Sequence, residues 1–213
     1  MINNESTAEK LAEYLLQINA IKLSPQTPFT WASGLKSPIY CDNRLTLSYP
    51  IVRQFIKQEF LAALKMHFPE AQSVAGVATA GIAHGALLAD AAELPFLYVR
   101  SAPKQHGLSN QIEGKINAGD KVVVIEDLIS TGKSSLEVVA ALRNAGAEVL
   151  GMMAIFTYGF ESANETFKNA DCKFVTLSDY HHLLNFAASK NLIATNQIET
   201  LQQWRTSPST WGV

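Results

Sequence analysis

The feature that most restricts the fold is a regular alternation of strand-like and helix-like segments between residues 73 and 178. Short apolar runs alternate with stretches whose apolar residues recur at helical spacing, which predicts a parallel sheet with helices on both faces. The run Val-Val-Val-Ile at 122–125 is typical of a strand buried on both sides. The expected strands are 73–78, 96–100, 121–127, 149–158 and 174–178, and the expected helices between them are 81–92 and 131–145.

The segments on either side of this region complete an α/β domain. Ser6 and Glu9 form a capping-box pattern, and the apolar residues after them recur at helical spacing, so the chain is expected to open with an amphipathic helix. Prolines divide residues 21–49 into short extended pieces, which predicts a small subdomain of irregular strands. Further helices are expected at 50–67, 180–190 and 194–204, so residues 1–213 are expected to form one domain.

Charge and composition argue against several classes of protein. A net charge of −2 does not suit a protein that binds nucleic acid by neutralising many phosphates, so any anion site must be local. No stretch reaches the roughly 18–20 apolar residues of a membrane span, and the first residues carry no secretory signal. The cysteines, Cys41 and Cys172, are too sparse for a disulfide framework. We therefore expect a cytoplasmic protein that binds neither nucleic acid nor membranes.

A long connection separates two of the expected strands. Residues 101–120 show no hydrophobic period and contain three glycines. A loop of this length inside a compact domain is typically a lid or a disordered tip. Its charged beginning, with Arg100, Lys104 and His106, favours a lid.

The most informative segment is VVVIEDLISTGKSS at 122–135. A buried strand ends in two adjacent acids, Glu126 and Asp127, and the next helix begins a few residues later. Ligands of parallel sheets bind at the carboxyl ends of the strands, where helix amides and the Ser and Thr hydroxyls of this turn can hold a phosphate. Two carboxylates beside that site can accept hydrogen bonds from a sugar diol and attract a hydrated Mg²⁺. The segment therefore suits a 5-phosphorylated ribose.

Three other interpretations fit this segment less well. The tripeptide Gly132-Lys133-Ser134 looks like the end of a Walker A loop, but Asp127 stands where that motif needs a glycine, and an acid there would repel a polyphosphate. A dinucleotide fingerprint needs three glycines, whereas this turn has one. An exposed strand end before an ordinary helix cap does not account for two acids that directly follow four apolar β-branched residues.

The same segment closely resembles the phosphoribosyl-diphosphate motif of type I phosphoribosyltransferases. Further blocks resemble orotate phosphoribosyltransferases in the order of that family, and the similarity extends from about residue 7 to residue 204. The block FTWASGLKSPIYCDNR at 29–44 is similar to the hood over the base, GVATAGI at 76–82 to the pyrophosphate loop, and 98–107 to the catalytic loop. The resemblance implies the type I phosphoribosyltransferase fold, a parallel sheet flanked by helices, with 21–49 as an N-terminal hood and 101–120 as a flexible catalytic loop.

The family reaction transfers ribose 5-phosphate from 5-phospho-α-D-ribose 1-diphosphate (PRPP) to orotate, giving orotidine 5′-monophosphate and diphosphate in UMP biosynthesis. The resemblance implies Mg²⁺ as cofactor, bound through PRPP and through water to Glu126 and Asp127 rather than directly by the protein. It also implies a homodimer in which each catalytic loop reaches the partner's active site. The catalytic residues implied are Lys104, His106 and Asp127, the PRPP-binding residues are Arg100, Lys104, His106, Glu126, Asp127, Leu128, Ile129, Ser130, Thr131, Gly132, Lys133 and Ser134, and the orotate-binding residue is Ser130, with Lys36 and Tyr40 as further candidates.

The chain also departs from the better-known branch of this family, because four positive contacts of that branch are missing or displaced. Either Lys36, Lys133 or Arg44 supplies the missing charge, or this chain binds its substrates with less positive charge. The branch has lysines where Ala32, Ala80 and Ser101 stand and an arginine near the position of Tyr158.

Two rival functions remain open at this stage. A purine phosphoribosyltransferase would share residues 126–134, and a regulator that senses PRPP while binding nucleic acid would need a basic face. The net charge and the absence of any Lys/Arg run argue against the regulator. The pair His181-His182 is expected to be a solvated helix start rather than a metal site, because adjacent helical side chains point in different directions.

Overall fold

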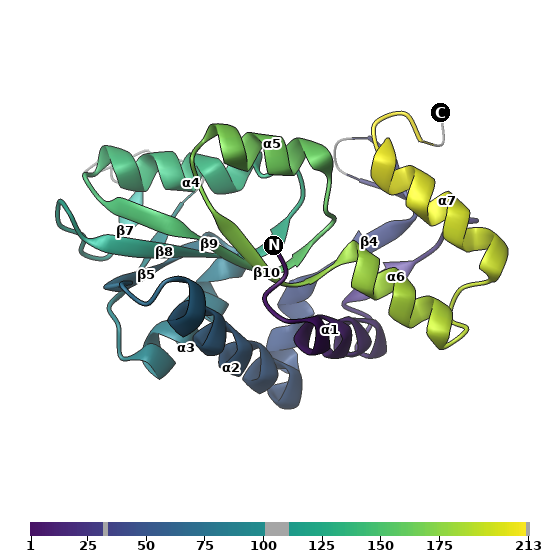
Figure 1. Cartoon of the computed structure of the whole chain (residues 1–213), viewed down its shortest axis with the longest axis horizontal. Helices are drawn as coiled ribbons and strands as arrows, with labels where there is room; N and C mark the ends of the chain where they lie inside the picture. The colour runs from purple at the N-terminus through teal and green to yellow at the C-terminus, as the bar shows by residue number, and fades with distance from the viewer. Residues whose placement is uncertain (32–33, 101–110, 212–213) are drawn as a thin grey trace.

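The computed structural model describes residues 1–31, 34–100 and 111–211. In this part of the chain, a six-stranded sheet forms the centre of the molecule, and its neighbouring strands are parallel except where β7 joins the edge (Figure 1). The predicted parallel sheet is therefore confirmed. In spatial order the strands are β10 (Phe174–Asp179), β9 (Glu148–Thr157), β8 (Lys121–Ile129), β5 (Ser73–Val77), β6 (Phe96–Val99) and β7 (Ile112–Glu113).

Helices cover both faces of the sheet, which explains why the central strands are apolar on both sides (Figure 1). The side chains of 122–125 in β8 are fully buried, as the run of β-branched residues predicts. On one face lie α4 (Lys133–Asn144) and α5 (Glu161–Asn169), and on the other lie α1 (Glu5–Gln17), α2 (Pro50–His67) and α3 (Ala80–Ala92).

Residues 21–49 form the small subdomain that the prolines predict, here called the hood. It contains two antiparallel strand pairs and a 3₁₀ helix that the sequence did not predict. Beside the hood lie α6 (Tyr180–Ser189) and α7 (Thr195–Thr206) (Figure 1). The hood elements are β1 (Ile21–Leu23), β2 (Phe29–Thr30), β3 (Lys36–Ser37), β4 (Ile39–Cys41) and η1 (Asn43–Ser48).

An aromatic cluster holds the hood against the rest of the domain. The ring of Trp31 stacks on Tyr158 at a centroid distance of 5.5 Å and meets the edge of Trp204 at 5.8 Å. Trp204, from α7, is fully buried at this junction. Aromatic residues dominate core energetics because each buries a large apolar area, so the C-terminal helix is part of the structure that places the hood.

Several local features differ from the sequence predictions. The first helix is capped by Asn4, whose side chain accepts from the Thr7 amide, rather than by a box on Ser6. Helix α5 was not predicted. Strand β7 lies inside the range 101–120 that was predicted as a loop, because Ile112 packs against the core and pairs with Val99 at the sheet edge.

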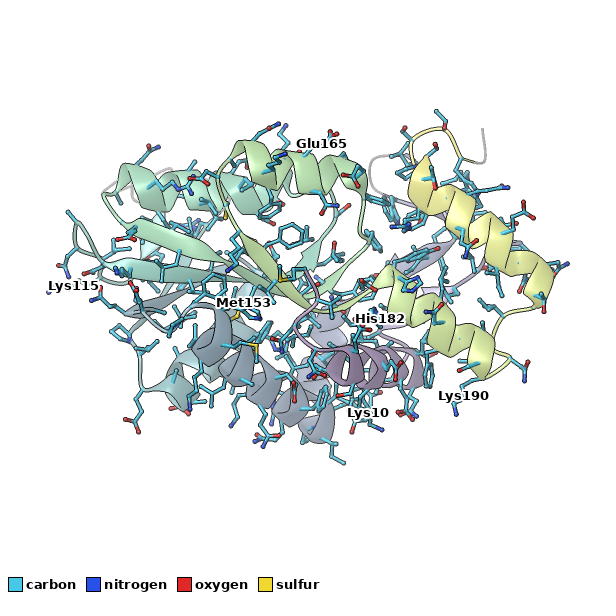
Figure 2. All side chains as sticks on the ribbon, in the orientation of Figure 1. Lys10, Lys115, Met153, Glu165, His182 and Lys190 are labelled. Carbon is cyan, nitrogen blue, oxygen red and sulfur yellow. The ribbon has the colours of Figure 1, made fainter. Side chains whose placement is uncertain are left out.

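The prediction that His182 is a solvated residue is wrong. Its ring nitrogens lie 2.7 Å from Asp179 Oδ1 and 2.7 Å from Glu5 Oε2, so it joins α6 to α1 (Figure 2). Burial lowers the pKa of His182, but the hydrogen bonds that its ring makes to these two carboxylates outweigh burial and raise the pKa above its usual value. Two acids distant from each other in sequence supply this environment, so the adjacent-histidine pattern could not reveal it.

The structure also bears on the expectations about membrane spans and cysteines. Within the described residues, no helix combines the length and apolar character that crossing a bilayer requires. Both cysteines are free thiols, with Cys172 buried and Cys41 half-buried.

Close packing of α3 on β8 sets the shape of the sheet edge where the acids lie. A Cβ atom on Gly81 would stand 2.3 Å from the carbonyl oxygen of Ile125, the residue directly before Glu126. Only glycine allows the backbones to approach this closely. Gly85, one turn later, would place a Cβ 2.8 Å from the Phe96 ring, which is a side chain and can rotate away.

We therefore expect Gly81→Ala to lower the free energy of unfolding by about 1–3 kcal/mol, because backbone must move to make room. The gain in helix propensity, about 1 kcal/mol, only partly offsets this loss. Urea unfolding followed by circular dichroism measures the change. Gly85→Ala is the matched control and should be close to neutral, and equal stability of the two variants would contradict the packing argument.

Candidate active site

The two acids predicted to form the site lie at the carboxyl end of β8, in the middle of the sheet. Glu126 is 6% exposed, and its carboxylate accepts from the Asp127 amide at 2.9 Å and from the Ser135 hydroxyl at 3.1 Å. Ser135 belongs to α4, so one hydrogen bond ties the strand end to the following helix. Asp127 is more exposed than Glu126 and faces the same cavity.

Both carboxyl groups are in an unfavourable electrostatic environment. Burial raises the pKa of Glu126 well above its usual value, and the neighbouring Asp127 raises it further. Burial also raises the pKa of Asp127, although hydrogen bonds and the Arg44 guanidinium oppose the shift. Hydroxyl donors or a cation placed between the acids would relieve this repulsion.

These donors fit the expected Mg²⁺ only in part. Oxygen ligands suit this ion, which keeps several waters and takes substrate oxygens beside one or two carboxylates. In the described parts of the chain, no cluster of three or more His, Cys, Asp or Glu side chains could enclose a metal. The pair therefore fits an ion that arrives with a ligand better than one held permanently by the protein.

The turn after the acids has the geometry of an anion site. Helix α4 begins at Lys133, and no described side chain caps its N-terminus. Its first amides are therefore available to an anion, which the helix dipole also favours. Gly132 adopts φ +81°, and a Cβ there would lie 2.5 Å from the Phe167 ring. The unpredicted helix α5, which carries Phe167, thus fixes the shape of this turn.

The opposite wall of the cavity comes from the loop between β5 and α3. The peptide bond between Ala78 and Thr79 is cis. This loop is the segment predicted from resemblance as the pyrophosphate loop. The structure brings it together with the acids in one cavity, whose lining includes Val77, Thr79, Gln111, Glu126, Asp127 and Ser134.

Several of the remaining predicted residues do not line this cavity. Arg100 directly follows β6; its amide donates to Gln111 O at 2.9 Å and its guanidinium lies 3.7 Å from Glu113. Lys104 and His106 lie outside the described residues. Ser130 and Thr131 line a second cavity beside the C-terminal segment, together with Trp31 and Arg205.

The two candidate orotate contacts of the hood do not line the cavity of the acids. Lys36 is exposed and donates to the Thr30 hydroxyl at 2.8 Å, within its own strand pair. Tyr40 is 41% exposed, and its ring packs on Phe29 at 5.7 Å. Their role in binding orotate stays a prediction.

One residue with a direct link to the acids was not predicted. Asn43, in the hood, donates from Nδ2 to the backbone carbonyl of Asp127 at 2.7 Å. It stands inside the 29–44 block, but nothing in the sequence indicates a contact between positions 84 residues apart.

The fold and this site together define a phosphoribosyltransferase, and residues 47–184 match the family model described as "Phosphoribosyl transferase domain". An orotate phosphoribosyltransferase of Porphyromonas gingivalis is 53% identical over 95% of this chain and 97% of its own length. One of Bacteroides thetaiotaomicron is 56% identical over 94% of each chain. The solved orotate phosphoribosyltransferase of Aeropyrum pernix is 27% identical with a TM-score of 0.74, covering 86% of this chain and 99% of that one. The chain therefore belongs to the orotate phosphoribosyltransferase family.

The raised pKa values make a prediction about stability. Because the folded chain holds the carboxyl protons more tightly than the unfolded chain, the pair's contribution to stability falls as pH rises from the ordinary carboxyl range through the raised values. Asp127→Asn should therefore unfold at a higher temperature than the wild type near about pH 8, and the difference should shrink towards about pH 5.

The same substitution should also lower turnover by at least about 100-fold, since the site loses the negative charge of the Asp127 carboxylate.

Thermal unfolding without ligands at both pH values measures the first effect, and initial rates measure the second. The exposed Glu165 on α5 (Figure 2) provides a control, because Glu165→Gln also removes one negative charge. If both variants shift the unfolding temperature equally, the effect comes from net charge and the buried pair does not explain it.

Proposed function

We propose that this site transfers the ribose 5-phosphate group of PRPP to orotate, giving orotidine 5′-monophosphate and diphosphate. The proposal rests chiefly on one arrangement, in which a buried and a half-buried acid, the turn into an uncapped helix start and the loop between β5 and α3 meet at one cavity. A donor of this kind carries a diol, a monophosphate and a diphosphate, and the site offers a separate set of groups to each.

In the transition state the ribose becomes more positive and the leaving diphosphate more negative, so the protein's contribution is mainly electrostatic. As the bond to the diphosphate breaks, the ribose C1 becomes cationic, and Glu126 and Asp127 hold the neighbouring diol. Residues 128–134 hold the 5′-phosphate through amides and hydroxyls. Mg²⁺, when bound with PRPP, supplies positive charge to the leaving diphosphate.

The residues of the predicted lid are assigned to the leaving diphosphate. Arg100, Lys104 and His106 are proposed to meet the diphosphate when the loop closes, and closure keeps water from the activated sugar. Arg100 already stands at the carboxyl edge of the sheet, at the start of this loop. We further propose that the chain acts as a cytoplasmic homodimer whose loops are shared between subunits, an inference that rests on family analogy.

A coupled assay tests the proposed function. Purified protein with PRPP and Mg²⁺ should release diphosphate when orotate is added, and a chelator in excess of the metal should abolish the reaction. Adenine, hypoxanthine and xanthine serve as the competing bases. Turnover with one of these purines and none with orotate would show that the substrate assignment is wrong.

Lys104→Ala should lower kcat by about 100-fold while changing the KM for PRPP much less, because its contact forms mainly in the closed transition state. Lys115 is exposed and belongs to the same long connection (Figure 2). Lys115→Ala is therefore the matched control and should retain near-normal kcat. Steady-state rates at saturating orotate decide the matter, and a normal kcat in Lys104→Ala would remove this lysine from the mechanism.

A further inference from the structure

Asn43 links the hood to β8, the strand that carries Glu126 and Asp127. Its side chain is fully buried, and Nδ2 donates to the main-chain carbonyl of Asp127 at 2.7 Å. A buried side-chain amide that meets a single backbone carbonyl fixes the position of that peptide, because losing the donor leaves a buried acceptor unsatisfied. The contact therefore sets where the Asp127 backbone lies relative to the hood.

The orientation of the Asn43 amide is determined by its other neighbour. Its Oδ1 lies 3.4 Å from Sγ of Cys41, whose thiol donates to it. Burial, with Asp127 and Asp42, raises the pKa of the Cys41 thiol well above its usual value, so the thiol keeps its proton. The amide oxygen therefore faces Cys41 and the amide nitrogen faces Asp127.

A second hydrogen bond holds the backbone of Asn43. The Thr46 hydroxyl donates to the backbone carbonyl of Asn43 at 2.6 Å and also lies 3.1 Å from Nε2 of His84. Burial, with Arg53, lowers the pKa of His84 to about 4, so its ring is neutral near pH 7. Since the hydroxyl proton is already used on Asn43, His84 donates from Nε2 to the Thr46 oxygen.

These contacts form a continuous chain across the site. His84 belongs to α3, which begins after the loop that follows β5, and Asp127 lies near the end of β8 on the opposite wall of the cavity. The hood residues Thr46 and Asn43 connect the two walls through hydrogen bonds, of which those of Thr46 are buried and that of Asn43 to Asp127 is partly buried.

We propose that Asn43 is a positioning residue. Its hydrogen bond fixes the Asp127 backbone so that the Asp127 carboxylate can reach the ribose diol of PRPP, and Thr46 and His84 hold Asn43 in place. This proposal rests on the proposed function of the site. Asn43 acts on the substrate only through Asp127, so its loss should weaken PRPP binding more than orotate binding.

The test compares Asn43→Leu with Ser178→Ala. Leucine keeps the approximate shape of asparagine without its donor. Ser178 is a matched control because its buried hydroxyl also donates to a backbone carbonyl, that of Ala8 at 2.8 Å, in a contact that joins β10 to α1. Both variants should lower the unfolding midpoint.

We expect Asn43→Leu to raise the Kd for PRPP, measured by calorimetry with Mg²⁺ and without orotate, by at least about tenfold, roughly the loss of one hydrogen bond to a site group. Its KM for orotate should change less than about threefold. Ser178→Ala should leave both values unchanged, because partial unfolding reduces the active fraction without altering the affinity of folded molecules.

If Asn43→Leu fails to fold, Thr46→Val carries the same test, since it keeps Asn43 and removes only its support. It should raise the Kd for PRPP by about threefold. A folded Asn43→Leu, or failing that a folded Thr46→Val, with wild-type PRPP affinity would overturn the proposal. Orotate turnover by the wild type is measured separately, so a wrong base assignment would not be mistaken for a wrong role of Asn43.

Discussion

The whole site depends on two carboxyl groups, the buried Glu126 and the half-buried Asp127, that the fold holds next to each other near the end of β8. Burial raises the pKa of both Glu126 and Asp127, and the neighbouring Asp127 raises that of Glu126 further, so the folded chain carries an electrostatic penalty before any ligand binds. Only part of that penalty is offset within the protein, by the Ser135 hydroxyl, the Asp127 amide and the Arg44 guanidinium. A ligand that brings hydroxyl donors and a cation together would remove the remainder, which couples binding to the relief of repulsion.

Backbone geometry places the other binding groups around these acids. Parallel strands direct the turns that follow them to one edge of the sheet, so the loop after β5 and the turn after β8 face one cavity. Two glycines allow this proximity, since Gly81 lets α3 approach Ile125 and Gly132 adopts a positive φ against Phe167. The anion site is thus built largely from main-chain groups, whose positions follow from the packing of helices on the sheet.

Sequence reasoning predicted what is local along the chain. The alternation of strands and helices, the acids after 122–125 and the helix start near Lys133 are all readable from short segments, and the structure confirms them. Contacts between distant positions were not readable. Asn43 meets Asp127, His182 meets Glu5 across 177 positions, and Phe167 shapes the Gly132 turn, yet none of these residues belongs to a local pattern that indicates its partner.

The structure also limits which groups of this chain could replace the four positive side chains that the better-known branch uses to bind its substrates. Tyr158, near the position of the missing arginine, is buried in the aromatic cluster with Trp31, and burial raises the pKa of its phenol so that it stays neutral. Among the three substitutes considered, Lys36 is hydrogen-bonded within the hood, and Arg44 is the one whose charge acts on Asp127. Arg44 is itself paired with Asp42, so it adds little net charge. Lys133, the third substitute, is exposed at the start of α4, and Arg100 lies beside Glu113. With these few cationic side chains among the described residues, we expect helix amides and a cation that arrives with the ligand to provide much of the stabilisation of an anionic ligand at this edge.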